Sequence, residues 1–181
     1  MPSDAAPGDD QVRAVAPQDL DLICRHREEM FRDAGTPDTE LAVMTQHFAR
    51  WLRPRLADGT YFGFILTAGG QPAGGVGLML IDWPPHPLHT TTDRRGYVLN
   101  LFVEPEHRRR GLARKLMQVA EQELAKRGAA FLILHATEKG RPLYSELGWM
   151  PGSAEMVKKL QPGSHAASDT EPPGRAPHSL G

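Results

Sequence analysis

The stretch LFVEPEHRRRGLARKL, residues 101–116, decides both the fold and the functional site that the sequence predicts. It begins as an apolar strand, turns at Pro105, passes through a basic loop that contains Gly111, and continues as an amphipathic helix. A loop of this kind presents main-chain N–H groups at a helix N-terminus, where the helix dipole favours anions. Cations oppose the dipole there, so the three consecutive arginines at 108–110 indicate a bound anion. A solvated basic helix start is the alternative.

The composition is that of one globular domain. The 181 residues are 40% hydrophobic and carry a formal net charge of -1, which argues against a general nucleic-acid or membrane-surface binder. The single cysteine, Cys24, excludes an intrachain disulfide and a cysteine zinc cluster, and we expect it to pack in the core. The apolar runs are shorter than a membrane helix of ~20 residues, and the N-terminus lacks the apolar stretch of a secretory signal. We therefore expect a soluble cytoplasmic protein with no metal site.

Hydrophobic spacing and turn residues predict the order of the elements. We expect a strand at 11–15, a helix from Pro17 to Gly35, a second helix from Thr36 to Pro54, a hairpin of strands 61–67 and 76–83, a loop at 82–96, a central strand at 97–103, a helix at 111–128, a strand at 129–134, a short helix at 140–147, and a strand near 155–160. Glycines at 74, 75 and 77 indicate an irregular or closely approached strand.

This order predicts an α/β fold. A strand-helix-strand crossover makes strands 97–103 and 129–134 parallel, so the architecture is one mixed α+β sheet with helices on both faces. The domain spans residues 11–160. It is preceded by a flexible arm at 1–10 and followed by a tail at 161–181, whose composition is typical of disorder.

Two motifs resemble those of the GCN5-related N-acetyltransferases (GNATs). The first is Arg108-x-x-Gly111-x-Ala113, which follows a V-x-P turn and lies between a strand and a helix. The second is RPLYSELGW, residues 141–149, which is similar to the Leu-Tyr-x-x-x-Gly-aromatic segment of that family. The resemblance extends over about residues 11–160 and implies the GNAT-like acyl-CoA N-acyltransferase fold.

The resemblance implies acetyl-CoA as co-substrate and a primary amine as acceptor, which attacks directly in a ternary complex. Main-chain amides of residues 109–113 would bind the pyrophosphate, and the strand at 101–103 would carry a bulge, diverge from its parallel neighbour and pair with the pantetheine arm. A main-chain N–H near Phe102 or Val103 would stabilise the developing oxyanion. The cofactor-binding residues implied are Leu101, Phe102, Val103, Arg108, Arg109, Arg110, Gly111, Leu112 and Ala113.

The departing CoA thiolate needs a proton, and Tyr144 aligns with the general acid of the family. A core tyrosine with a satisfied hydroxyl is the alternative interpretation. Relatives often carry an asparagine seven residues before this tyrosine, whereas Thr137 stands at that position here. Tyr144 is therefore a candidate acid whose surrounding hydrogen bonds depart from the family pattern.

The acceptor amine must be neutral to attack, but the sequence offers no certain base. Some relatives use a strand glutamate acting through water, and we align that position with Leu99. Neighbouring Asn100 cannot act as a base but can orient a water molecule or the amine. His135, at the end of a buried strand, is a candidate base, and a structural histidine is the alternative. Glu104 is another candidate, although a glutamate before a proline turn is usually solvated. Water alone can serve amines that are already partly neutral.

The acceptor site is expected between the first two helices and the loop 82–96, which offers Trp83, His86, His89 and Asp93 as lining groups or as surface residues. No acidic cluster demands a polycationic acceptor, so we expect a small-molecule or amino-acid-like amine. We expect neither nucleic acid nor membrane as a partner, while a homodimer is possible.

A non-catalytic acyl-CoA sensor is the alternative function. A nucleic-acid binder using the arginines 108–110 is disfavoured, because no aromatic residues lie between them.

Overall fold

The computed structural model describes residues 10–152 of the chain, and its compact unit ends at Trp149. Its elements are β1 (Gln11–Ala14), η1 (Pro17–Asp19), α1 (Leu20–Asp33), α2 (Asp38–Asp58), β2 (Phe62–Ala68), β3 (Gln71–Asp82), β4 (Arg94–Val103), η2 (Pro105–His107), α3 (Leu112–Lys126), β5 (Leu132–Leu134) and α4 (Arg141–Glu146). The strand expected near 155–160 and the tail at 161–181 lie outside the described residues, as does nearly all of the arm.

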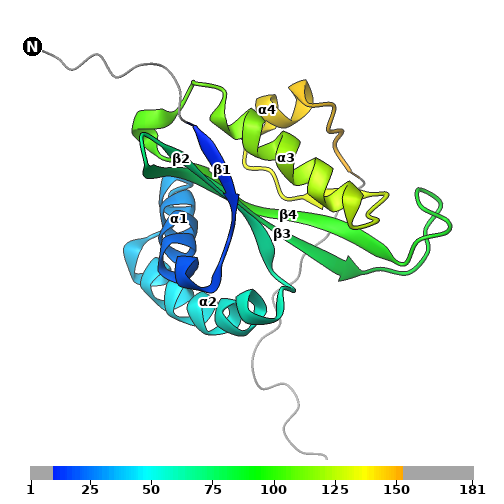
Figure 1. The fold of residues 1–181 in the computed structure, drawn as a ribbon, viewed down its shortest axis with the longest axis horizontal. Coiled ribbons are helices and arrows are strands. Elements are labelled where there is room, and N and C mark those ends of the chain that lie inside the picture. The colour runs from blue at the N-terminus through cyan, green and yellow to red at the C-terminus, as the bar shows by residue number, and fades with distance from the viewer. Residues whose placement is uncertain (1–9, 153–181) are drawn as a thin grey trace, which may run out of the picture. The chain divides into compact units, whose positions relative to one another are not determined.

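The five strands form one mixed sheet in the order β1-β2-β3-β4-β5. The first four strands are antiparallel to their neighbours, and β5 pairs parallel with β4. Helices α1 and α2 cover one face of the sheet, and α3 and α4 lie on the other (Figure 1). The predicted mixed α/β sheet with helices on both faces is confirmed.

Each face of the sheet has its own hydrophobic core. The apolar stripe of α3, including Leu116, Met117 and Leu124, packs on β2, β3 and β4. The other core joins α1 and α2 to the opposite face, with Leu52, Tyr61 and Ile65 almost fully buried. Cys24 belongs to this second core, as expected. The sheet is therefore buried on both sides and forms a rigid platform for the site.

Helix α2 continues through Pro54 to Asp58, so the prediction that Pro54 ends this helix was wrong. Proline removes one helical hydrogen bond, to the carbonyl of Arg50, but both residues are exposed and that carbonyl can be solvated. Leu52 and Leu56 remain buried on either side of the proline and hold the last turns on the core. The helix ends instead at Gly59, whose φ of 75° gives a left-handed cap.

The segment predicted as a long loop at 82–96 is the tip of a β-hairpin. Strand β3 extends to Asp82 and β4 begins at Arg94. Between them, the Trp83 N–H donates to the Asp93 carbonyl at 2.8 Å. His86 and His89 form a further bridge near the tip. Because proline and histidine are frequent in this segment, its sequence did not indicate that the two strands continue to pair there, and the predicted loop was too long. Strand β5 is in turn shorter than the predicted 129–134.

The glycine-rich start of β3 meets a bulge in β4, which confirms the irregularity predicted there. Gly77 pairs with Leu99 and Gly75 pairs with Phe102, so one residue of β3 faces two residues of β4. The backbones approach closely, since a Cβ atom at Gly74 would lie 2.6 Å from the Phe102 carbonyl oxygen. A Cβ atom at Gly77 would overlap the Tyr61 hydroxyl. Glycine is therefore required along this part of β3.

Candidate active site

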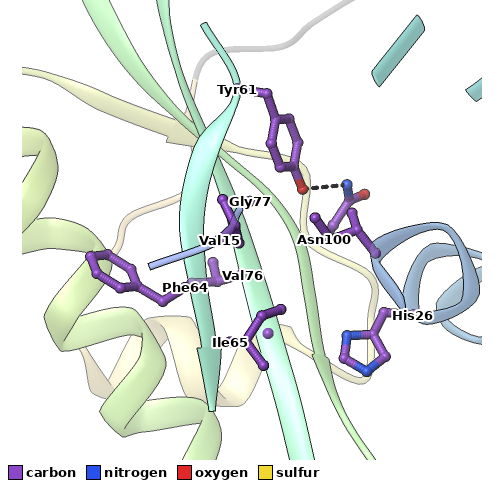
Figure 2. A pocket seen from close by; sticks show the side chains of 10 residues that line it. Val15, His26, Tyr61, Phe64, Ile65, Val76, Gly77 and Asn100 are labelled. Atoms are coloured by element: carbon purple, nitrogen blue, oxygen red, sulfur yellow. Dashed lines mark hydrogen bonds between the residues drawn. The ribbon is translucent and has the colours of Figure 1, made fainter. Parts of the chain in front are cut away.

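The bulge turns the Asn100 side chain toward α1. Regular alternation would aim it at the apolar core under α3, but Asn100 has a φ of 55°, a left-handed conformation that asparagine tolerates. Its Nδ2 donates to the Tyr61 hydroxyl at 3.1 Å, and its Oδ1 accepts from Arg27 Nη1 at 2.6 Å. Figure 2 shows the Tyr61 and Asn100 side chains meeting beside a cavity of about 10 Å³, which has room for about one water molecule. Asn100 thus anchors the bulge.

Strands β4 and β5 diverge beyond the bulge. Their parallel pairing ends at Val98 and Leu134, so the last five residues of β4 have β3 alone as a partner strand. The Glu104 N–H donates to the Ala73 carbonyl of β3 at 2.9 Å. Because N–H groups alternate along a strand, those of Leu101 and Val103 point away from β3, into the gap. This alternation favours Val103 over Phe102 as the donor to an oxyanion.

The N-terminus of α3 follows the diverging end of β4 and offers free main-chain donors. Gly111 caps the helix with a φ of 79°, and a Cβ atom there would meet no atom within 4 Å. Helical hydrogen bonding begins at the Lys115 N–H, which donates to the Gly111 carbonyl at 3.0 Å. The preceding N–H groups of the first turn therefore have no helical partner. Arg109 also has a positive φ, 60°, so the loop holds two left-handed residues next to this open space.

The three arginines of the loop have different surroundings. Arg108 donates from Nε to the Val103 carbonyl at 2.9 Å, and its Nη2 lies 2.6 Å from the Asp33 carboxylate at the end of α1. Its side chain therefore fastens the end of β4 to α1. All three arginines are exposed, and Arg110 lies 2.9 Å from His107 Nδ1 and 3.6 Å from the Asp10 carboxylate. Arg109 and Arg110 can face a bound anion, whereas Arg108 is held between the end of β4 and α1.

Tyr144 lies on α4, half-buried against the core under α3. Its ring centroid is 6.3 Å from that of Trp149, and burial raises the pKa of its hydroxyl above the ordinary value. The phenol is therefore protonated at neutral pH, as an ordinary tyrosine also is. Thr137 Oγ1 accepts the Gly140 N–H at 3.2 Å and the Thr137 carbonyl accepts the Arg141 N–H at 3.1 Å, so Thr137 stabilises the turn that leads into α4.

His135 directly follows β5 and is exposed. Its Nδ1 lies 2.9 Å from the Tyr97 hydroxyl, and the two rings meet edge to face at 5.7 Å. Tyr97 is on β4 and lines a hollow on the α1 and α2 face of the sheet. His135 is thereby connected to that hollow through one hydroxyl group.

The hollow has a volume of about 450 Å³, within the range of small-molecule sites. It lies between α1, α2 and the strands β3 and β4, and it is lined by Arg27, Met44, His47, Phe48, Trp51, Met79, Tyr97 and Leu99. Its place against the first two helices agrees with the expected acceptor site. None of the four residues predicted from the loop, Trp83, His86, His89 and Asp93, is among those that line it.

Two of those four residues serve the hairpin instead. The guanidinium of buried Arg95 lies over the Trp83 ring at 4.0 Å, and its Nε donates to His89 Nε2 at 2.9 Å. His89 is itself buried and packs against Phe131 at 5.5 Å between ring centroids. These contacts give the hairpin a small core of its own, which explains why its side chains turn away from the hollow.

Glu104 is buried rather than solvated. Its Oε1 lies 2.6 Å from Arg25 Nη2 and 3.3 Å from Nε2 of His26, which is only 2% exposed. Burial raises the pKa of the Glu104 carboxyl, but Arg25 outweighs it and holds the pKa below the ordinary value. Burial and the charge of Arg25 lower the pKa of His26 to about 4. The pair therefore consists of an ionised carboxylate and a neutral imidazole, and it ties the end of β4 to α1.

The sequence analysis did not assign Arg27 and Tyr61 to the site. Tyr61 is separated from Asn100 by 39 residues and Arg27 by 73, so no local pattern connects them. A signal was nevertheless present in the helix. Arg27 occupies a position in the apolar stripe of α1, where a charged residue requires a special partner.

Residues 22–149 match the model of the acetyltransferase (GNAT) family. The chain belongs to this family. Its members are acetyl-CoA-dependent N-acetyltransferases, so the predicted family, fold, enzyme class and co-substrate are confirmed. Among the described residues, no helix is both long and apolar enough to cross a membrane.

Solved structures of GNAT proteins superpose on most of the chain. A GCN5-related N-acetyltransferase from Ralstonia eutropha JMP134 is 54% identical, with a TM-score of 0.81 over 83% of this chain and 98% of its own. A predicted acetyltransferase from Clostridium acetobutylicum, solved with acetyl-CoA, shares the fold at 24% identity, with a TM-score of 0.76 over 86% of this chain and 99% of its own. A search of curated proteins gave no match.

Proposed function

We propose that this GNAT enzyme transfers an acetyl group from acetyl-CoA to the primary amine of a small-molecule or amino-acid-like acceptor, by direct attack in a ternary complex. The observation that carries the proposal is the gap between β4 and β5, whose free edge leads within eight residues to the open N-terminus of α3. A thioester arm and a phosphate group can then be bound by one continuous segment of main chain. The acceptor hollow lies on the α1 and α2 face of the same strand.

The donor residues fit acetyl-CoA, which supplies a thioester that reacts with a neutral amine and releases CoA as a thiol. The N–H groups of Leu101 and Val103 are available to the pantetheine arm and to the oxygen on which negative charge develops. The N–H groups at the start of α3 accept the pyrophosphate, with the exposed Arg109 and Arg110 beside them. Leu112 and Ala113 contribute main-chain donors, and Gly111 lets the phosphate approach.

Proton transfer is assigned to residues on the two sides of the sheet. Tyr144 donates its phenolic proton to the departing sulfur, a role supported by its place in the segment RPLYSELGW, residues 141–149. His135 takes the proton of the attacking amine through the Tyr97 hydroxyl or through water, a role supported by the 2.9 Å contact with Tyr97. Asn100 acts as a positioning residue, because its amide bonds to Tyr61 and holds Arg27, which lines the hollow.

Calorimetric titration with acetyl-CoA tests the donor site, and the chain offers a matched pair of variants. Gly111 and Gly128 cap opposite ends of α3, with φ values of 79° and 86°, and a Cβ atom at either position would meet nothing within 4 Å. Replacement by alanine should therefore cost each variant about 1 kcal/mol of stability. Only Gly111→Ala places a methyl group where the phosphate approaches, and it should weaken acetyl-CoA binding at least tenfold.

Equal binding by Gly111→Ala, Gly128→Ala and the unchanged protein would exclude the loop as the phosphate site. Binding of acetyl-CoA without thiol release across a broad panel of amines would instead support the alternative function, an acyl-CoA sensor. Release of thiol with an amine, dependent on the enzyme, would support the transferase.

A further inference from the structure

Arg27 is a largely buried cation that has no carboxylate partner among the described residues. Its guanidinium lies over the rings of Phe31 and Phe48, 4.9 and 4.6 Å from their centroids, and one nitrogen donates to Asn100. Its Nε atom is buried and has no hydrogen-bond partner in the described part of the chain. A buried charge without a counter-ion is costly, so this arrangement suggests that a ligand supplies the counter-ion.

Other arginines of α1 have carboxylates beside them. Arg25 pairs with Glu104 at 2.6 Å, and Arg32 pairs with Glu28 at 2.8 Å and with Asp38 at 3.1 Å. The helix therefore neutralises two of its more exposed cations and leaves the more buried one uncompensated. Arg27 differs from them in a second respect, since it lines the hollow.

The rest of the hollow is apolar and aromatic. Met44, Trp51, Met79 and Leu99 form most of its wall, and Phe48 continues the surface on which Arg27 rests. His47 is the other basic side chain there, and no acidic side chain is among the residues that line it. An acceptor that matches these walls carries an anion at one end and an apolar group beside it.

We propose that the acceptor is an α-amino acid with an apolar side chain, whose carboxylate is bound by Arg27 and whose side chain packs against Met44, Trp51 and Met79. This inference rests on the proposed function and names the substrate class of the same site. Arginine suits a carboxylate because its planar fork can donate two parallel hydrogen bonds. The aromatic and thioether side chains provide an adaptable apolar surface.

The position of Arg27 favours a compact acceptor. It is bonded to Asn100, which immediately precedes Leu101 and lies three residues before Val103 on the same strand. The carboxylate site is therefore close to the N–H groups assigned to the thioester oxygen. An α-amino acid carries amine and carboxylate on one carbon, which suits a carboxylate site close to the reacting carbonyl.

The deciding experiment compares an acid with its amide on the unchanged enzyme. Thiol release from acetyl-CoA is measured with L-phenylalanine and L-phenylalaninamide, and with L-leucine and L-leucinamide. The amide lacks the neighbouring carboxylate, so its amine is less basic and a larger share of it is neutral. Intrinsic reactivity therefore favours the amide. We nevertheless expect kcat/KM to be at least tenfold higher for the acid than for the amide. Because intrinsic reactivity favours the amide, a preference for the acid can come only from binding of its carboxylate.

A matched pair of variants assigns the effect to Arg27. Arg27→Met should abolish the preference for the acid, while Arg50→Met, at an exposed arginine of α2 away from the hollow, should preserve it. A purely structural role for Arg27 would lower kcat/KM equally for acid and amide, and this result would overturn the proposal. If Arg27→Met does not fold, the comparison of acid with amide on the unchanged enzyme still tests whether the acceptor needs a carboxylate.

The pattern of thiol release across acceptors distinguishes failure of this inference from failure of the proposed function. Thiol release with amides or with 2-phenylethylamine that equals or exceeds release with the acids would overturn the inference and leave the acetyltransferase intact. Saturation-transfer NMR supplies a readout independent of turnover. Binding of L-phenylalanine that is lost in Arg27→Met, in an enzyme that releases no thiol with any amine, would support the carboxylate site and reject the proposed transfer.

Discussion

Replacing Asn100 by alanine should destabilise the domain strongly, because Asn100 holds the β4 bulge from within the core. The side chain is 6% exposed and makes two hydrogen bonds, one of them to the charged Arg27. Loss of a hydrogen bond to a charged group costs about 1.5–3 kcal/mol and loss of a neutral one about 1 kcal/mol. Alanine at a φ of 55° adds about 1 kcal/mol of backbone strain. The expected decrease in the free energy of unfolding is therefore about 3.5–5 kcal/mol.

Urea unfolding followed by circular dichroism measures this decrease, and thermal unfolding should show a midpoint lower by roughly 10 °C. Asn100→Gly is the matched control, because glycine loses the same hydrogen bonds but accepts the positive φ. It should fall between the unchanged protein and Asn100→Ala. A loss below about 0.5 kcal/mol in Asn100→Ala, or a glycine variant less stable than the alanine variant, would refute this account of the bulge.

Three further predictions concern the proposed general acid Tyr144, the buried His26 and Gly77 of β3. Tyr144→Phe should lower the rate of thiol release at least tenfold and leave the acetyl-CoA Kd unchanged; full turnover would exclude Tyr144 as the acid. The folded-state pKa of His26, about 4, lies below its unfolded value, so the unfolded state binds more protons and stability should fall by up to about 3 kcal/mol between pH 6.5 and 4. His26→Leu should flatten this dependence and His47→Gln, on the exposed face, should not; an unchanged slope in His26→Leu would contradict the assignment. Gly77→Ala should destabilise through overlap with the Tyr61 hydroxyl, and the double variant with Tyr61→Phe should recover part of the loss; simple addition of the two effects would argue against this contact.

The elements that carry the proposed donor site could be predicted because they are contiguous. An apolar strand, a turn at Pro105, a loop with Gly111 and an amphipathic helix follow one another within residues 101–116, and each has a local signal. The resemblance to GNAT proteins added the bulge and the gap between the strands. Asn100 was a candidate because it can orient a water molecule or the amine, although the sequence did not reveal that it contacts Arg27 and Tyr61.

The acceptor half could not be predicted because its residues come together only through tertiary packing. The walls of the hollow are contributed by two helices and two strands, and the pattern of each element indicates only which side is buried. The loop at 82–96 was chosen in the prediction because of its histidines and Trp83, yet Arg95 holds Trp83 by a cation–π contact and His89 by a hydrogen bond within the hairpin. Glu104 was misjudged for a similar reason, since its partners lie on α1, far away in sequence.

The most direct test of the central claim is mass spectrometry of the products formed from acetyl-CoA and a mixture of amino acids and simple amines. The proposed function predicts that one amine is acetylated on nitrogen for each CoA thiol released, and that both products require the enzyme. Thiol release without an acetylated amine would mean hydrolysis, and neither product, despite bound acetyl-CoA, would mean a sensor. Either result would contradict acetyl transfer to an amine.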